Sequence, residues 1–325
     1  MKILLAATGD FAMPTFRVLA DGGHEVIGLV TQPDRPSGRG RQVHTAAVKQ
    51  AALDAGIPVM QPPRIAAHDV VARIAEMAPE VFLVIAYGQK IPQEICRLPP
   101  NGAINLHGSL LPELRGAAPC NWAIIHGLKR TGVSVMYLAP RMDAGDVLGR
   151  RETTIGPRET AGQLHDRLAT LGADVVLDVL GQLEAGTHRP VVQDESHVTL
   201  APRLSKADGL IDWSLPAERL DCLVRGLSPW PGAFAFLAQA GHEALRVIVE
   251  DAAPAVAGDA APHGEAPGTV LQAGHRLLVA TGQGALDIIQ VKPQSGRSMT
   301  AEAFCNGRGV RPGDRFVASE AEGEI

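Results

Sequence analysis

Apolar runs alternate with helix-type patterns along the first half of the chain. The apolar runs that predict buried strands lie at 1–8, 25–31, 81–87, 103–107 and 132–138. The sequence between them has the amphipathic spacing of helices, and a longer helical pattern covers 160–184 before Gly186. Strands that alternate with helices indicate an α/β fold with a doubly wound, mostly parallel, Rossmann-like sheet.

The pattern changes after this long helix. Residues 189–206 are irregular and predict a linker. A helical pattern at 217–226 is then followed by short apolar runs at 233–237, 245–249, 268–272, 276–280 and 285–291. Short strands separated by glycine and polar turns are typical of a small OB-like β-barrel. We therefore expect a Rossmann-like domain over 1–188, a linker over 189–206, a barrel domain over 207–316 and a disordered tail over 317–325.

A polar, basic stretch interrupts the first domain at 32–43. Its prolines and glycines lead us to expect no regular structure there. The stretch contains Arg35, Arg39 and Arg41, and a loop of this kind can place guanidinium groups against phosphates. An ordinary solvated loop is the alternative reading of the same charges.

Candidate chemistry gathers at the end of the predicted strand 103–107. Side chains on a strand alternate between faces, so Asn105, His107 and Ser109 share one side. The chain then turns at Pro112 and Gly116, as expected at the carboxyl edge of a parallel sheet. Ligands bind at that edge in open α/β folds.

A carboxylate that follows the next predicted strand completes a plausible constellation. Asp143 lies in a loop that can reach the same edge, although Asp146 is an alternative. An Asp beside His107 would orient the ring and favour its charged form, and the Asn105 amide would stabilise an oxyanion. No Gly-x-Ser-x-Gly nucleophile motif is present. These groups suit direct attack on a carbonyl by an amine of the substrate; a histidine that merely caps the strand is the structural alternative.

Composition narrows the class of protein. The 325 residues carry a net charge of −5, which argues against a surface that binds nucleic acid as a whole. The four cysteines form no Cys-x-x-Cys pair, so we expect neither metal binding nor a disulfide framework, and a reducing compartment fits. The first apolar run is too short for a signal peptide or a membrane span. We expect a cytoplasmic protein.

Several motifs together resemble those of one enzyme family. Asn105–Pro112, Arg115–Pro119 and Asp143–Asp146 are similar to the signature of the 10-formyltetrahydrofolate-dependent formyltransferases. The segments that narrow the resemblance to the methionyl-tRNA formyltransferases are 31–41, 86–88, 203–206 and 229–231. The resemblance extends from Met1 to about Phe316.

The resemblance implies a reaction and a set of site residues. It makes Asn105, His107 and Asp143 a catalytic trio for transfer of a formyl group to the α-amine of methionyl-tRNA. It implies 10-formyltetrahydrofolate as the donor cosubstrate, with no metal. The residues implied to bind it are Ser109, Leu110, Leu111, Pro112, Tyr87 and Gly88. Those implied to contact the initiator tRNA are Arg35, Arg39, Arg41 and Lys206. A monomer without a membrane partner is expected.

The sequence departs from the family pattern at two places. The first turn reads Ala7-Thr8-Gly9 where the family usually has Gly-Thr-Pro. Acidic residues outnumber basic ones from Arg203 onward, so tRNA contacts there would need a local cluster. The candidates for that cluster are Lys292, Arg297, Arg308, Arg311 and Arg315.

Three alternatives to this function remain open. A formyltransferase acting on a nucleotide-linked amino sugar would share the trio. A hydrolase would pass the formyl group from 10-formyltetrahydrofolate to water. A folate- or tRNA-binding protein would have lost catalysis.

Overall fold

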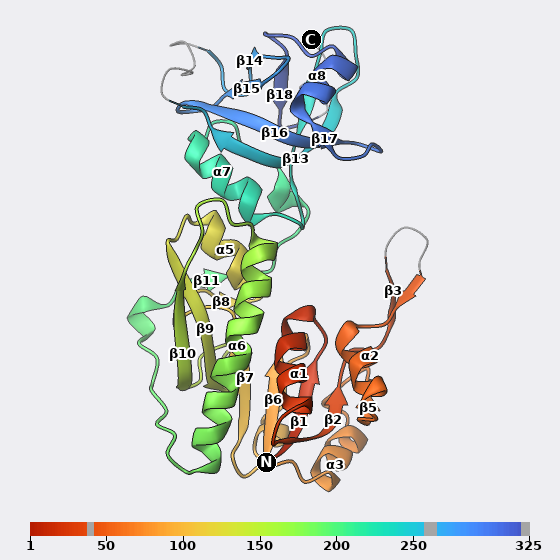
Figure 1. Ribbon diagram of the computed structural model, residues 1–325, viewed down its shortest axis with the longest axis vertical. Helices are drawn as coiled ribbons and strands as arrows, with labels where there is room; N and C mark the ends of the chain where they lie inside the picture. The colour runs from red at the N-terminus through yellow and green to blue at the C-terminus, as the bar shows by residue number, and fades with distance from the viewer. Residues whose placement is uncertain (38–41, 257–264, 320–325) are drawn as a thin grey trace. The chain divides into compact units, whose positions relative to one another are not determined.

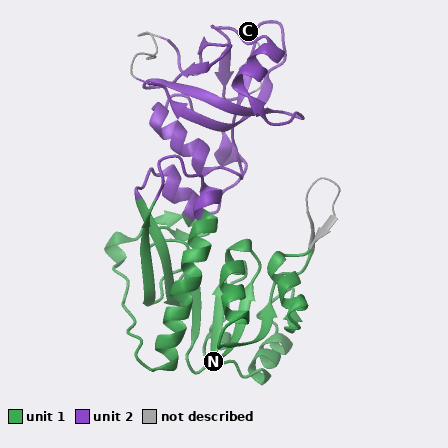
Figure 2. Cartoon of the chain, viewed as in Figure 1, with its two compact units in different colours: residues 1–119, 130–154, 165–202 green, residues 120–129, 155–164, 203–325 purple. Residues whose placement is uncertain are grey.

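Two units, each with its own sheet, make up the chain in the computed structural model (Figure 2). Unit 1 contains residues 1–119, 130–154 and 165–202, and unit 2 contains 120–129, 155–164 and 203–325. The structure describes residues 1–37, 42–256 and 265–319.

The sheet of unit 1 has the strand order β10-β9-β7-β6-β1-β2-β5 (Figure 1). Its strands are β1 (Lys2–Ala7), β2 (Glu25–Val30), β5 (Val59–Met60), β6 (Val81–Ile85), β7 (Ala103–His107), β9 (Arg130–Tyr137) and β10 (Val147–Thr154). The five strands from β5 to β7 run parallel, whereas β9 is antiparallel to both β7 and β10. The prediction of a mostly parallel, Rossmann-like sheet is confirmed.

Helices pack on both faces of this sheet. They are α1 (Met13–Ala20), α2 (Ala47–Asp54), α3 (His68–Glu76), α4 (Gln93–Cys96) and α6 (Ala161–Glu184), with a 3₁₀ turn η1 (Asp10–Ala12). Helix α5 (Pro119–Ile125) lies in unit 2 except for its first residue. On one face, Leu4 and Phe82 share an apolar cluster with Ile74 of α3. On the other, Leu106 lies so near Gly172 of α6 that a Cβ at Gly172 would be 2.7 Å from it. None of the described helices is both long and apolar enough to cross a membrane.

Three strands of unit 1, in two regions of the chain, differ from the sequence-based expectations. Residues 32–43, expected to be irregular, contain the antiparallel pair β3 (Arg35–Ser37) and β4 (Gln42–His44). A two-stranded ribbon has open edges, and these tolerate the missing N–H of a proline. Strand β10 was not predicted, because it is an edge strand in which every residue from Arg150 to Thr154 is polar and exposed residues alternate with half-buried ones. An edge strand with one solvated face lacks the apolar run that marks a buried strand.

Unit 2 is an antiparallel barrel with the strand order β14-β15-β16-β13-β12-β18. Its strands are β12 (Ala233–Ala238), β13 (Leu245–Pro254), β14 (Val270–Gln272), β15 (Leu277–Ala280), β16 (Ala285–Pro293), β17 (Met299–Thr300) and β18 (Arg315–Val317). Hydrogen bonds from Val270 N to Asp314 O (2.8 Å) and from Phe316 N to Gly268 O (2.7 Å) bring its two ends together. The predicted barrel and its five strands are confirmed.

Other elements of unit 2 were only partly anticipated. The predicted helix is α7 (Ala217–Gly226), and a short 3₁₀ turn η3 (Ala207–Gly209) precedes it. Helix α8 (Ala301–Arg308) and β18 lay outside the expected pattern. Val317, placed at the start of the expected disordered tail, is the last residue of β18, and 320–325 lie outside the described residues.

The irregular segment near 187–202 contributes structure to unit 1. It contains the 3₁₀ turn η2 (Glu195–His197) and the short strand β11 (Leu200–Ala201), which pairs in parallel with β8 (Arg115–Gly116). The segment therefore supports the loop that follows β7, beyond the connecting role expected of a linker.

Candidate active site

Strand β7 presents two polar side chains on one face. Asn105 and His107 lie two residues apart, while Leu106 between them faces helix α6. His107 is buried, with 6% of its surface exposed, and Asn105 is half-buried. The side-chain amide of Asn105 makes no hydrogen bond to any described residue, so its N–H groups can serve a ligand.

The His107 ring lies between two oxygen acceptors. Nε2 is 2.9 Å from the main-chain oxygen of Leu114, and Nδ1 is 3.8 Å from Oδ2 of Asp143. Leu114 adopts a positive φ of 57°, which turns the main chain in this part of the loop. A ring that donates from Nε2 to Leu114 has a fixed orientation, with Nδ1 directed toward the carboxylate. Only the doubly protonated ring carries hydrogens for both acceptors.

Asp143 comes from the loop between β9 and β10. Its Oδ2 accepts a hydrogen bond from the main-chain N–H of Gly116 (2.8 Å), so the same oxygen faces a fixed donor and His107. Two glycines allow the close approaches. A Cβ at Gly116 (φ +132°) would lie 2.4 Å from the Ala201 oxygen, and one at Gly145 would lie 1.8 Å from the Tyr137 oxygen. The structure thus brings Asp143 within ion-pair distance of His107.

The loop after β7 is fixed by its own hydrogen bonds. Ser109 is fully buried, and its hydroxyl donates to the Glu113 main-chain oxygen at 2.6 Å. The Ser134 hydroxyl donates to the Ser109 main-chain oxygen at 2.7 Å, and Leu111 packs with Met136. Ser109 therefore shapes the loop rather than exposing its hydroxyl to a ligand.

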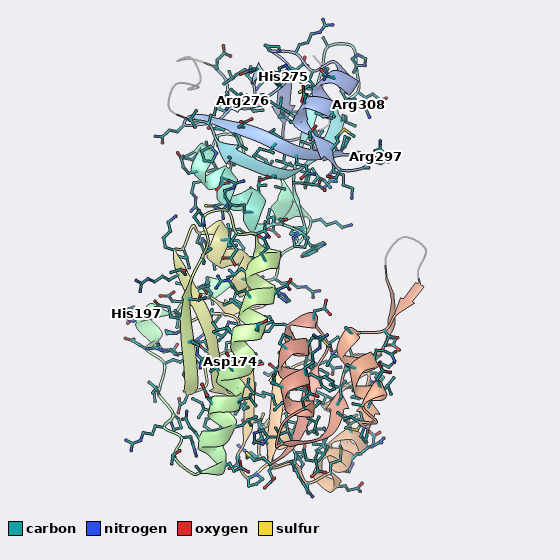
Figure 3. All side chains as sticks on the ribbon, viewed as in Figure 1. Asp174, His197, His275, Arg276, Arg297 and Arg308 are labelled. Carbon is teal, nitrogen blue, oxygen red and sulfur yellow. The ribbon has the colours of Figure 1, made fainter. Side chains whose placement is uncertain are left out.

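A cavity of about 520 Å³ adjoins this loop. Its lining residues are Leu110, Leu111, Pro112, Glu113, Arg150, Glu152 and His197. Figure 3 shows His197 at the outer side of unit 1, on η2. The cavity is within the size range of small-molecule sites, although no member of the trio lines it. Among the described residues, no cluster of three or more His, Cys, Asp or Glu side chains could hold a metal ion.

The segment after β6 offers main-chain groups to this edge. The Tyr87 side chain lies in the apolar cluster of the sheet, and its buried hydroxyl has no hydrogen-bond partner among the described residues. Burial raises the pKa of this hydroxyl to about 12. The Tyr87 main-chain oxygen accepts hydrogen bonds from Thr8 Oγ1 (3.2 Å) and Gln32 Nε2 (3.1 Å). Gly88, which follows, is exposed and has a positive φ of 90°.

The basic residues expected to contact tRNA are only partly described. Arg39 and Arg41 lie outside the described residues, and only the backbone of Arg35, in β3, is described. Lys206 is exposed in unit 2. Asp34 lies just before β3, and hydrogen bonds from Lys49 and Gln61 lower the pKa of its carboxyl group.

A buried polar cluster behind Asp143 was missed by sequence reasoning. Gln193 donates hydrogen bonds to the main-chain oxygens of Asp143 and Gly145, and accepts hydrogen bonds from buried Arg115. Glu195 binds both Arg115 and Arg141. Hydrogen bonds, first from Arg115 and then from Arg141, lower the pKa of the Glu195 carboxyl group. Arg115 belongs to the recognised motif, but no pattern in the irregular segment marks Gln193.

Sequence comparisons cover both units. The model of the formyl transferase family matches residues 1–180, and that of the formyl transferase C-terminal domain matches 203–309. The methionyl-tRNA formyltransferase of Solibacter usitatus is 42% identical, over 97% of this chain and 98% of its own length. That of Desulfotalea psychrophila is 43% identical over 94% and 93%, respectively.

Solved structures share the fold at low identity. HypX from Aquifex aeolicus, solved in complex with tetrahydrofolic acid, has a TM-score of 0.61 and 19% identity, covering 94% of this chain and 47% of HypX. An N-formyltransferase from Helicobacter canadensis, solved with folinic acid and dTDP-3-aminofucose, has a TM-score of 0.66 and 11% identity, covering 92% and 100%. With the trio assembled and both units matched, the chain belongs to the formyl transferase family of enzymes, in the branch of the methionyl-tRNA formyltransferases.

Proposed function

We propose that the protein transfers the formyl group of 10-formyltetrahydrofolate to the α-amine of initiator methionyl-tRNA. The observation that carries the proposal is the convergence of His107, Asp143 and Asn105 on one side of β7. The substrates come from the relatives named methionyl-tRNA formyltransferase, which match nearly the whole chain at about 40% identity.

The trio would act on the bond between the amine and the formyl carbon. As the amine nitrogen attacks, the formyl oxygen gains negative charge, which donors at this position stabilise. Asn105 has an amide that can donate to this oxygen. The Nδ1–H of His107 would donate as well, because Nδ1 is 3.8 Å from Asp143, farther than a hydrogen bond reaches. The carbon–N10 bond then breaks, and the proton lost by the amine passes to N10. Asp143, whose Oδ2 is 3.8 Å from Nδ1, would hold the ring in orientation.

The folate would lie at the edge of the sheet, along the loops that follow β6 and β7. Leu110, Leu111 and Pro112, in the loop that follows β7, line a cavity of about 520 Å³, a volume in the range of small-molecule sites. Ser109 would act by shaping this loop. Tyr87 and Gly88 would contribute main-chain groups, because the Tyr87 side chain is in the core.

The tRNA would be contacted by Arg35, Arg39, Arg41 and Lys206. Guanidinium and ammonium groups bind phosphates without reading sequence, so these residues would supply affinity. The remaining surface carries no general excess of positive charge, since the net charge is −5.

A direct assay tests this function. The protein is incubated with methionyl initiator tRNA and a folate donor labelled in the formyl group, and the methionine is recovered after mild hydrolysis of the ester. We expect label on the methionine nitrogen, and none with the His107→Ala variant. Rapid release of labelled formate without tRNA would instead indicate a hydrolase. Label only on a nucleotide-linked amino sugar would indicate a sugar formyltransferase, and folate binding without any transfer would reject catalysis.

A further inference from the structure

We propose that Gln193 is the positioning residue that holds Asp143 against His107, with Arg115 fixing the orientation of Gln193. The inference rests on the proposed function only in assigning Asp143 to the reaction. The contacts themselves are independent of which amine accepts the formyl group.

The Gln193 amide satisfies two carbonyls of the Asp143 loop. Its Nε2 donates to the main-chain oxygen of Asp143 at 2.8 Å and to that of Gly145 at 2.7 Å. Only 7% of Gln193 is exposed, so water cannot readily replace these donors. A buried carbonyl that lacks a hydrogen bond lowers the stability of the folded protein. Removing the amide would therefore favour a different path for the loop.

Arg115 fixes the orientation of the Gln193 side-chain amide. The Gln193 Oε1 accepts from Arg115 Nε (3.1 Å) and from an Arg115 terminal nitrogen (2.8 Å). A guanidinium group only donates and a carbonyl only accepts. The amide oxygen must therefore face Arg115, and the amide nitrogen must face the loop. Arg115 also donates to Glu195 at 3.0 Å, which holds the guanidinium group from its other side.

Asp143 needs such support because its own loop gives it little. It has a positive φ of 52°, a conformation that most side chains disfavour. The neighbouring Met142 is 73% exposed, so the loop has no apolar anchor at that point. The Asp143 carboxylate is held by Gly116 N, whereas its main-chain oxygen is held by Gln193. Strand β8 thus reaches Asp143 twice, directly through Gly116 and indirectly through Arg115.

Two substitutions isolate this role. Gln193→Glu keeps an acceptor for Arg115 but replaces both loop donors with an oxygen. Gln193→Met keeps the approximate length of the side chain and removes all its hydrogen bonds. A misplacement of about 1 Å can cost roughly 100-fold in rate. We therefore expect kcat of formyl transfer to fall about 10- to 100-fold in both variants, with KM for tRNA and folate changed less than about threefold. Gln272→Glu, the same exchange at an exposed position in β14, should leave kcat unchanged.

A double-mutant cycle shows whether Gln193 acts through Asp143. Asp143→Asn retains a residue that tolerates positive φ but removes the carboxylate. In that background, Gln193→Glu should lower kcat less than about twofold further, since no positioned carboxylate remains to be displaced. Thermal unfolding and tetrahydrofolate binding, measured on each variant, report whether the protein remains folded.

Each result separates the inference from the proposed function. Unchanged kcat in both folded Gln193 variants would overturn the inference, as would a full additive loss in the Asp143→Asn background. A folded Gln193→Met with low kcat would support it even if Gln193→Glu failed to fold. If Asp143→Asn itself retained normal transfer, the assignment of Asp143 would fail and the inference would fall with it. If the wild-type protein transferred no formyl group to tRNA, the substrate proposal would be the one rejected, and the cycle would be repeated with the acceptor that is used.

Discussion

At the residue scale, the two polar side chains of β7 have opposite surroundings. Both His107 ring nitrogens lie near protein oxygens, whereas the Asn105 amide has no partner among the described residues. A donor without a protein partner can bond a ligand on which charge develops without giving up a hydrogen bond within the protein. The Asn105 amide is therefore the group whose hydrogen bond should matter most in the transition state.

Asn105→Ala tests this difference. Removing one oxyanion donor typically costs about 100- to 1000-fold in kcat. We expect a loss in that range, with KM for methionyl-tRNA little changed, measured by steady-state formyl transfer. Asn101→Ala, which lies in the turn just before β7, serves as the control and should retain the wild-type rate. A rate for Asn105→Ala within about twofold of wild type would exclude the amide from oxyanion stabilisation.

Sequence reasoning reached this site only in part. Alternation along a strand predicts that Asn105 and His107 share a face, and the structure agrees. Asp143 could not be chosen over Asp146 from spacing, because its approach depends on the backbone at Gly145 and Gly116. Gln193 could not be found at all, since a single amide in an irregular segment carries no periodic signal. Long-range hydrogen bonds between loops leave no local pattern in a sequence.

At the element scale, the loop between β9 and β10 is shaped by close backbone contact. A Cβ at Gly145 would lie 1.8 Å from the Tyr137 oxygen, which no rotamer change can relieve. Gly145→Ala should therefore displace the loop, lower the unfolding free energy by about 1–3 kcal/mol and reduce kcat. Gly181→Ala in α6 is the matched control, because nothing lies within 4 Å of its added Cβ. That helix should gain roughly 1 kcal/mol. Equal thermal midpoints for Gly145→Ala and Gly181→Ala would contradict the prediction that a Cβ at Gly145 displaces the loop.

The segment that contains Gln193 also contains a titratable group, Glu195, that binds two arginines. Glu195 accepts hydrogen bonds from Arg115 and Arg141, and these lower the pKa of its carboxyl group. A carboxyl group with a lowered folded pKa stabilises the protein above its unfolded pKa of about 4.3, and this contribution disappears as pH falls through the folded pKa.

Glu195→Gln should therefore be less stable than wild type at pH 7, and the difference should shrink as pH falls below about 4.3. Thermal midpoints of both proteins at pH 7, 5 and 3.5 give the measurement. Glu243→Gln, at an exposed position, controls for loss of a surface charge. If the difference in thermal midpoint between wild type and Glu195→Gln stayed constant down to pH 3.5, the ionised Glu195 carboxylate would not contribute to stability.

Elements were predictable where burial imposes a pattern. Strands β1 and β6 are buried almost throughout and are nearly continuous apolar runs in the sequence. Strand β10 and the pair β3–β4 were not predicted. Edge strands can carry many polar residues, so these segments lack the apolar pattern that marks a buried strand. Strand β18 has three residues, too few for any periodicity to show.

At the scale of the whole molecule, the change of pattern after α6 led to the expectation of two domains with different kinds of sheet. Alternating strands and helices require a sheet covered on both faces, and short strands with glycine turns require a sheet that closes on itself. Both requirements are physical, so the fold class followed from the pattern alone. Charge adds a second constraint at this scale. If the protein binds tRNA as proposed, a net charge of −5 leaves local groups of cations to make the contacts. Figure 3 labels two cations of unit 2, Arg297 and Arg308, that are candidates for such a group.

If local clusters of cations bind tRNA, the salt dependence of the affinity should report how many phosphates they neutralise. Each phosphate neutralised by a cation adds somewhat less than one unit to the slope of log affinity against log salt. Arg39→Ala should therefore raise KM for methionyl-tRNA with kcat retained, and reduce that slope by roughly one unit. Arg73→Ala, an exposed cation on α3, is the control and should leave the slope unchanged. Because the net charge is negative, non-specific attraction is weak and the loss of a single contact should be measurable. The slopes are compared between about 50 and 200 mM salt. Equal slopes for wild type and Arg39→Ala would mean that this arginine is solvated and takes no part in binding.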